Sequence, residues 1–187
     1  MAKLISKPFK EYDNNWLTVA NYVSAGGISG WTAGGSANGK VNQKKGIIYC
    51  NSDSSSYTAS LTTIRDLRTL GTIISFAAGG KAGADSTSTI KLTDGTNSLV
   101  LLQMGTSQMH AAYFTIVITG NSVKVYLPIS SGNAGTIIAD ETTQDISLWS
   151  SLKLQITQTN NATLSNVWCG PVMGNKSCIG SKGTAFS

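Results

Sequence analysis

The side chains able to carry acid–base or nucleophilic chemistry are few in this chain. The only histidine, His110, lies in the segment QMHAAY, where nothing nearby in the sequence orients it for catalysis. The nine acidic residues are spread over segments that we predict to be loops or arms, whereas glycoside hydrolysis needs two carboxyl groups facing each other. We therefore predict that the protein is not an enzyme. The less favoured alternative is a hydrolase that uses Asp94, Asp140 and Asp145.

Metal ligands are also scarce. With one histidine and no closely spaced cysteine pair, the chain lacks the ligands of a zinc site. Calcium prefers several carboxylate and carbonyl oxygens, and the segment DGTN, from Asp94 to Asn97, is one of two local oxygen clusters. The other combines Asp140 and Glu141 with Asp145. Turn chemistry is the favoured explanation of DGTN. We predict no cofactor, with calcium at Asp94 and Asn97 as the alternative.

Aromatic side chains in predicted loops offer a different chemistry, the stacking of ring faces on sugars or on the surface of a partner protein. We select Trp31, Tyr57 and Trp149 as the candidate contact residues, and Tyr113 belongs to the same group. Trp31 stands in a glycine-rich segment and is the best candidate for an exposed ring. The alternative, that Trp31 folds back to cap the core, fits the sequence equally well.

The elements that must position these side chains are predicted to be β-strands. In the run YFTIVITGNSVKVYLP, from Tyr113 to Pro128, two apolar arms meet at Gly120-Asn121, which suits a two-residue hairpin turn. This turn pairs Ile118 with Val123. It also pairs Phe114 with Leu127. Alternation then places six apolar side chains on one face: Phe114, Ile116, Ile118, Val123, Val125 and Leu127. A second hairpin, turning at 94–97, pairs Leu92 with Leu99 and Ile90 with Leu101.

The remaining segments give eight to ten short strands in total and almost no amphipathic helix. Strands are expected at 16–23, 47–50, 72–78, 136–139, 152–157 and 164–169, with one or two helical turns or an edge strand in 60–71. Long loops are expected at 24–45 and 79–86, and a connector at 104–111. The architecture that follows is an all-β, two-sheet antiparallel sandwich. We divide the chain into an arm (1–15), the sandwich (16–170) and a glycine-rich tail (171–187).

Charged residues make up 12% of the chain, about half of the usual share, and Gly, Ser, Thr and Asn replace them. This composition is typical of secreted, cell-surface and virion proteins. The net charge of +5 comes from dispersed lysines without an arginine cluster, which predicts no specific nucleic-acid binding. The N-terminal arm is basic because it contains Lys3, Lys7 and Lys10. We expect this arm to contact an acidic surface of a neighbouring protein.

The N-terminal segment and the cysteines indicate where in the cell the protein is made and exposed. The N-terminal segment has no apolar run of signal-peptide length, and no stretch of about 18 apolar residues predicts a membrane span. We expect assembly in the cytoplasm of a host cell and exposure later, in a virion; an extracellular protein is the alternative. Cys50 is predicted to be buried, and a disulfide between Cys169 and Cys178 is left open.

The order of the predicted strands supports a further interpretation. The series TIISFAA, a glycine loop, IKLTDGTNSLVLL, the central hairpin, DISLWSSLKLQITQ and LSNVWCG resembles concanavalin-like or laminin-G-like jelly rolls over about residues 45–170. The resemblance is to the versions found in phage decoration, fibre and tail proteins and in carbohydrate-binding modules. It implies a virion structural protein that binds other virion proteins as a homo-oligomer such as a trimer, and glycans on host surfaces. The alternative that it implies is a carbohydrate-binding module or lectin.

Overall fold

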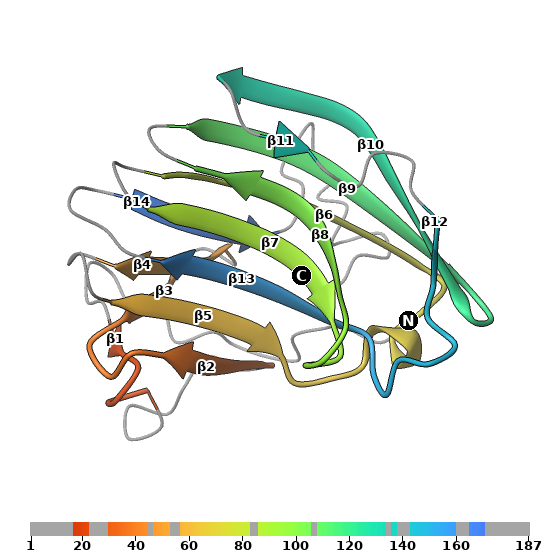
Figure 1. Cartoon of the computed structure of the whole chain (residues 1–187), viewed down its shortest axis with the longest axis horizontal. Helices are drawn as coiled ribbons and strands as arrows, with labels where there is room; N and C mark the ends of the chain where they lie inside the picture. Colours follow the sequence, from red (N-terminus) through yellow and green to blue (C-terminus); the bar gives the residue numbers. More distant parts are fainter. Residues whose placement is uncertain are drawn as a thin grey trace.

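A computed structural model describes residues 17–22, 30–44, 47–52, 57–82, 86–105, 108–133, 136–137, 143–159 and 165–170. Within these residues fourteen strands form two antiparallel sheets that pack face to face (Figure 1). The one helical element of this part is the 3₁₀ turn η1 (Leu67–Thr69), and no helix there is long and apolar enough to span a membrane. The predicted all-β sandwich of jelly-roll type is confirmed. The arm and tail predicted at 1–15 and 171–187 lie outside the described residues.

The larger sheet has eight strands in the order β1-β3-β4-β14-β6-β9-β10-β12. Most neighbours in this order are distant in sequence. Strand β14, for example, lies between β4 and β6. Their bounds are β1 (Leu17–Thr18), β3 (Lys40–Lys44), β4 (Ile47–Ser52), β14 (Ser165–Gly170), β6 (Ile73–Lys81), β9 (Met109–Thr119), β10 (Ser122–Asn133) and β12 (Thr143–Asp145).

The smaller sheet has six strands in the order β11-β8-β7-β13-β5-β2. Strand β13 occupies its centre and pairs with β5 on one side and β7 on the other. The bounds are β11 (Thr136–Ile137), β8 (Ser98–Met104), β7 (Thr87–Thr93), β13 (Lys153–Thr159), β5 (Thr58–Thr63) and β2 (Trp31–Gly35).

The central hairpin, β9–β10, follows the predicted register close to its turn. Gly120 has a φ of 55°, and Ile118 pairs with Val123 across the two strands. The predicted pairing of Phe114 with Leu127 is wrong, because the register shifts between Tyr126 and Ile129. Pro128 lies in this irregular stretch, and proline has no N–H with which to continue a regular ladder.

The β7–β8 hairpin shows a similar difference. Leu92 pairs with Leu99 as predicted, but Ile90 pairs with Leu102 instead of Leu101 because the register shifts between Ile90 and Lys91. The two consecutive leucines at 101 and 102 are both fully buried. A β-bulge accounts for this, since it re-aims one side chain that strict alternation would send outward.

Within the glycine-rich segment predicted as a long loop at 24–45, the described residues, 30–44, instead form strands β2 and β3 with a short turn between them. Gly35 has a φ of 109°, and a Cβ added there would lie 2.2 Å from the carbonyl oxygen of Thr58. The Ser36 N–H donates to that same carbonyl at 2.8 Å. Glycine is needed at position 35 because the backbone of β5 approaches closely. The glycines that indicated a loop therefore allow β2 to pack tightly against β5.

Two other segments predicted as connections also belong to strands. Strand β6 continues through Gly79 and Gly80 to Lys81, since β14 and β9 pair with it on both sides. Strand β9 begins at Met109, within the predicted connector at 104–111. In the first predicted strand, at 16–23, only Leu17 and Thr18 are paired among the described residues.

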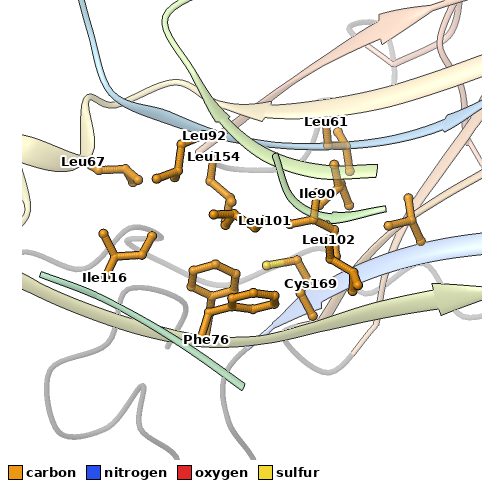
Figure 2. Packing of buried hydrophobic residues seen from close by; sticks show 14 of the residues in the cluster. Leu61, Leu67, Phe76, Ile90, Leu92, Leu101, Leu102, Ile116, Leu154 and Cys169 are labelled. Carbon is orange, nitrogen blue, oxygen red and sulfur yellow. The ribbon is translucent and has the colours of Figure 1, made fainter. Parts of the chain in front are cut away.

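The core lies between the two sheets and is built by the inward positions of both (Figure 2). Phe76 of β6 and Phe114 of β9 are paired across the larger sheet, and their rings stack with centroids 5.2 Å apart. Leucines and isoleucines of the smaller sheet face them, including Ile90, Leu92 and Leu154. Burial of such side chains stabilises the fold by about 1.5–3 kcal/mol each.

Candidate binding site

Trp31 does not present its ring to solvent. It is the first residue of β2, is only 1% exposed, and its carbonyl oxygen accepts a hydrogen bond from the Tyr22 hydroxyl at 2.6 Å. The prediction of an exposed Trp31 in a loop is wrong, and the alternative, that the ring contributes to the core, is what the structure has. Trp31 is buried because β2 pairs with β5, and this pairing holds the glycine-rich segment against the sandwich.

The other two aromatic candidates are placed less openly than predicted. Trp149 is buried in the core cluster, because the chain between β12 and β13 turns inward at Ile146 and Trp149. Tyr57 is half-buried, next to the start of β5, and its hydroxyl accepts a hydrogen bond from Asn38 Nδ2 at 3.1 Å. Trp31 and Trp149 are both buried, so the three candidates form no exposed aromatic cluster among the described residues.

Asp94 and Asn97 do lie together, in the turn between β7 and β8. Asp94 Oδ1 accepts hydrogen bonds from the backbone N–H groups of Thr96 (2.8 Å) and Asn97 (2.6 Å). Its Oδ2 accepts from Asn97 Nδ2 at 3.0 Å and from the Ser150 N–H at 3.1 Å. These bonds, with that of the Asn97 N–H foremost, lower the pKa of Asp94 to about 2. A calcium ion would compete with these donors for the same oxygens; calcium at this turn stays a prediction.

The titratable groups considered for catalysis are dispersed. His110 lies in β9, opposite Gly80 of β6 and Gly132 of β10 in the backbone register. Asp145 is the last residue of β12, and the Ser147 N–H donates to its Oδ1 at 2.8 Å, which lowers its pKa. Asp140, Glu141 and the arm lysines Lys3, Lys7 and Lys10 lie outside the described residues. Among the described residues no three His, Cys, Asp or Glu side chains gather in a metal-binding group.

The cysteines are interior residues where they are described. Cys50 of β4 and Cys169 of β14 are free thiols buried between the sheets, and burial raises the pKa of both. Burial of Cys50 is confirmed. A disulfide from Cys169 is not formed, and Cys178 lies outside the described residues.

The outer side of the larger sheet carries aromatic and aliphatic side chains over three neighbouring strands, β6, β9 and β10 (Figure 1). Phe76, Phe114 and Val125 point into the core, so the alternate positions of β6, β9 and β10 project outward. The register aligns these positions in rows, such as Ser75–Thr115–Tyr126. We call this surface the β6–β9–β10 face, with members Ile73, Ser75, Ala77, Tyr113, Thr115, Val117, Lys124 and Tyr126.

The chemistry of the β6–β9–β10 face combines rings, hydroxyls and one cation. Tyr113 is 37% exposed and lies opposite the small, buried Ala77. The hydroxyls of Ser75 and Thr115 share a hydrogen bond of 2.9 Å. The Lys124 ammonium lies 4.7 Å from the centroid of the Tyr126 ring, within cation–π range. At one end of the face Ile73 is 58% exposed.

The outer side of the smaller sheet is different. The described outward positions of β5, β13 and β7 carry hydroxyls, amides and two lysines, and no aromatic or large aliphatic residue: Thr58, Ser60, Thr62, Thr87, Thr89, Lys91, Lys153, Gln155, Thr157 and Thr159. Some of these groups bond to one another, as Gln155 Nε2 does with Thr62 Oγ1 at 2.8 Å. This is an ordinary solvated sheet face. The contrast singles out the β6–β9–β10 face.

Part of this face was present in the sequence. Alternation in the central hairpin already placed Thr115, Val117, Lys124 and Tyr126 on one side of the sheet, opposite to the core set. The sequence could not reveal that β6 lies beside β9 and completes the face with Ile73, because that pairing joins segments far apart in the chain.

Comparisons with known proteins add no family. No family model matches the chain, and no curated protein matches it. A solved structure, the exoplasmic/lumenal domain of VIP36 in its Ca²⁺/Man2-bound form, aligns with 91% of this chain and 92% of its own. The alignment has a TM-score of 0.41 and 7% sequence identity, too little to carry an argument about function. The assignment of the chain to the two-sheet antiparallel sandwiches therefore rests on its own strand pairing.

Proposed function

We propose that the protein is a non-catalytic, glycan-binding β-sandwich whose binding surface is the β6–β9–β10 face. The observation that carries the proposal is the partly exposed Tyr113 ring beside the Ser75–Thr115 hydroxyl pair on the outer side of the larger sheet. An exposed ring provides apolar contact area for the C–H side of a sugar, and its hydroxyl provides a hydrogen-bonding group. Tyr113 takes the role that the sequence had favoured for Trp31.

The arrangement suits binding better than bond cleavage. The described acidic side chains near strand ends, Asp94 and Asp145, are occupied by hydrogen bonds from backbone N–H groups. Those bonds lower their pKa values, whereas a general acid in glycoside hydrolysis needs a raised pKa. Thr115 and Ser75, the hydroxyls on the face itself, bond to each other.

The test is a glycan array probed with the wild-type chain and two tyrosine variants. Tyr113→Ala should lower the affinity for the bound glycans about tenfold or more, as expected for an aromatic residue at the centre of an interface. Tyr57→Ala is the matched control, because it removes the same side chain from a site next to the smaller sheet; it should bind like the wild type. Loss of binding in Tyr57→Ala alone, or no binding by the wild type, would contradict the proposal.

We propose as a second function a structural role in a virion, in which the sandwich is a decoration, fibre or tail subunit that contacts neighbouring subunits. The supporting observation is that two large apolar side chains are exposed on loops at one end of the sandwich. There Leu148 is 91% exposed, and Ile64 is exposed on an adjoining loop. Hydrogen bonds from Arg68 to the carbonyl oxygens of Trp149 and Ser150 tie the two loops together.

Sedimentation of the full chain tests this second function. A homo-oligomer that dissociates in the Leu148→Ser variant would support it, since surface substitutions of this kind leave the fold itself intact. A monomer that Leu148→Ser does not change would count against subunit contact through this end. The location that this role implies, a virion assembled in a host cytoplasm, is part of the same proposal.

A further inference from the structure

Lysine predominates among the charged residues in the strand sequences of the larger sheet. Its strands contain four lysines, Lys40, Lys44, Lys81 and Lys124, against one acidic residue, Asp145. Asp145 pairs with Ser122 at the edge of the sheet, and the Ser147 N–H already occupies its Oδ1. In the part of the chain that the structure describes, the Lys124 ammonium has no carboxylate partner.

Lys124 also has a defined position on the β6–β9–β10 face. In the register it lies opposite Val117 of β9, and its ammonium reaches back over the ring of Tyr126, two residues along the same strand. Tyr126 in turn lies opposite Thr115, which is two residues from Tyr113 on the same side of β9. Tyr113 therefore offers the open ring, and Lys124 with Tyr126 forms a cationic border beside it.

We infer that the glycan recognised by this face is acidic, carrying a carboxylate or sulfate that the Lys124 ammonium binds while a sugar ring packs on Tyr113. The inference rests on the proposed glycan-binding function and specifies its ligand. A lysine ammonium donates up to three hydrogen bonds and binds an anion as a point charge. Hydrogen bonds of this charge-assisted kind are stronger than those between neutral groups.

The experiment compares acidic and neutral oligosaccharides of equal length by isothermal titration: trigalacturonate against α-1,4-galactotriose, and sialyllactose against galactosyllactose. Sulfated lactose distinguishes a sulfate from a carboxylate. The wild type should bind the acidic member of each pair about three- to fivefold more tightly at low salt, which corresponds to the upper range for an exposed charge pair. The preference should shrink at about 1 M salt, where the screening length falls to about 3 Å.

Two lysine variants assign the effect. Lys124→Gln should remove the preference for acidic sugars, so that the two members of each pair bind with equal affinity. Lys153→Gln is the matched control, since Lys153 is a half-buried lysine on the outer side of the smaller sheet, and it should retain the preference.

The outcomes separate the inference from the function on which it rests. Equal binding of acidic and neutral sugars, lost in Tyr113→Ala, would overturn the acidic ligand and leave glycan binding in place. No binding of any sugar would overturn both. Tight, Lys124-dependent binding of a (dT)₂₀ oligonucleotide without binding of acidic sugars would also overturn the inference, because the anion would then be a nucleic-acid backbone.

Discussion

At the scale of single residues, Asp94 shows how a short polar segment can fulfil a structural role. The segment DGTN predicted a turn, with a calcium site as the alternative, and the carboxylate of Asp94 accepts four hydrogen bonds from N–H groups. One of these donors, the Ser150 N–H, comes from the chain between β12 and β13. The residue thus closes the β7–β8 turn and links it to a distant loop.

This role predicts a pH-dependent contribution to stability. The folded pKa of Asp94 is about 2, below its usual value of 3.8, so the carboxylate stabilises the fold fully above about pH 4 and loses its effect as the pH falls toward 2. Asp94→Ala should therefore lower the Tm between pH 5 and 7, and the difference from the wild type should shrink between pH 4 and 2. Thermal unfolding followed by circular dichroism measures this.

Thr96→Ala is the control for that series, because Thr96 contributes a backbone donor that alanine keeps. It should unfold like the wild type at every pH. A Tm difference for Asp94→Ala that is the same at pH 2 and pH 7 would rule out the carboxylate as its cause. An increase of the wild-type Tm on addition of calcium, absent in Asp94→Ala, would instead place an ion at this turn.

At the scale of elements, the glycines of β2 are fixed by their neighbours. A Cβ at Gly35 would collide with the Thr58 carbonyl, whereas a Cβ at Gly95 meets nothing within 4 Å, although both residues have a positive φ, 109° and 101°. Gly95→Ala should cost about 1–2 kcal/mol of the free energy of unfolding, the usual strain of a left-handed alanine. Gly35→Ala should cost more, because the β2–β5 contact must open. Urea denaturation compares the two, and equal losses would contradict the close approach.

The register of a hairpin was predicted correctly close to its turn. The prediction failed further along the strands, where the register depends on packing with other strands. The turn at Gly120 and the pair Leu92–Leu99 followed from the sequence. The pairing at Phe114 was lost because Pro128 interrupts the ladder, and Leu101 and Leu102 both entered the core because a bulge lies beside them. The position of a bulge depends on packing against the opposite sheet, and a local sequence pattern does not reveal that packing.

At the scale of the whole molecule, the class of fold was predictable because short alternating runs with turn residues between them suit stacked antiparallel sheets. The binding face was only half predictable. Lys124 and Tyr126 could be placed together by alternation, but Ile73 joins them only through the β6–β9 pairing, in which its partner Val117 lies 44 residues further along the chain. For the same reason Trp31 was assigned to a loop, since its burial depends on β5.

The central claim is that a sugar binds on the outer side of β6, β9 and β10. The most direct measurement is a ¹⁵N NMR titration of the full chain with the oligosaccharide that binds best on the array, following each assigned backbone amide. The account predicts chemical-shift changes centred on Tyr113, Thr115 and Tyr126, with the amides around Thr89 and Thr157 of the smaller sheet unchanged. Changes centred on Tyr57, on Asp94 or on the smaller sheet would contradict it.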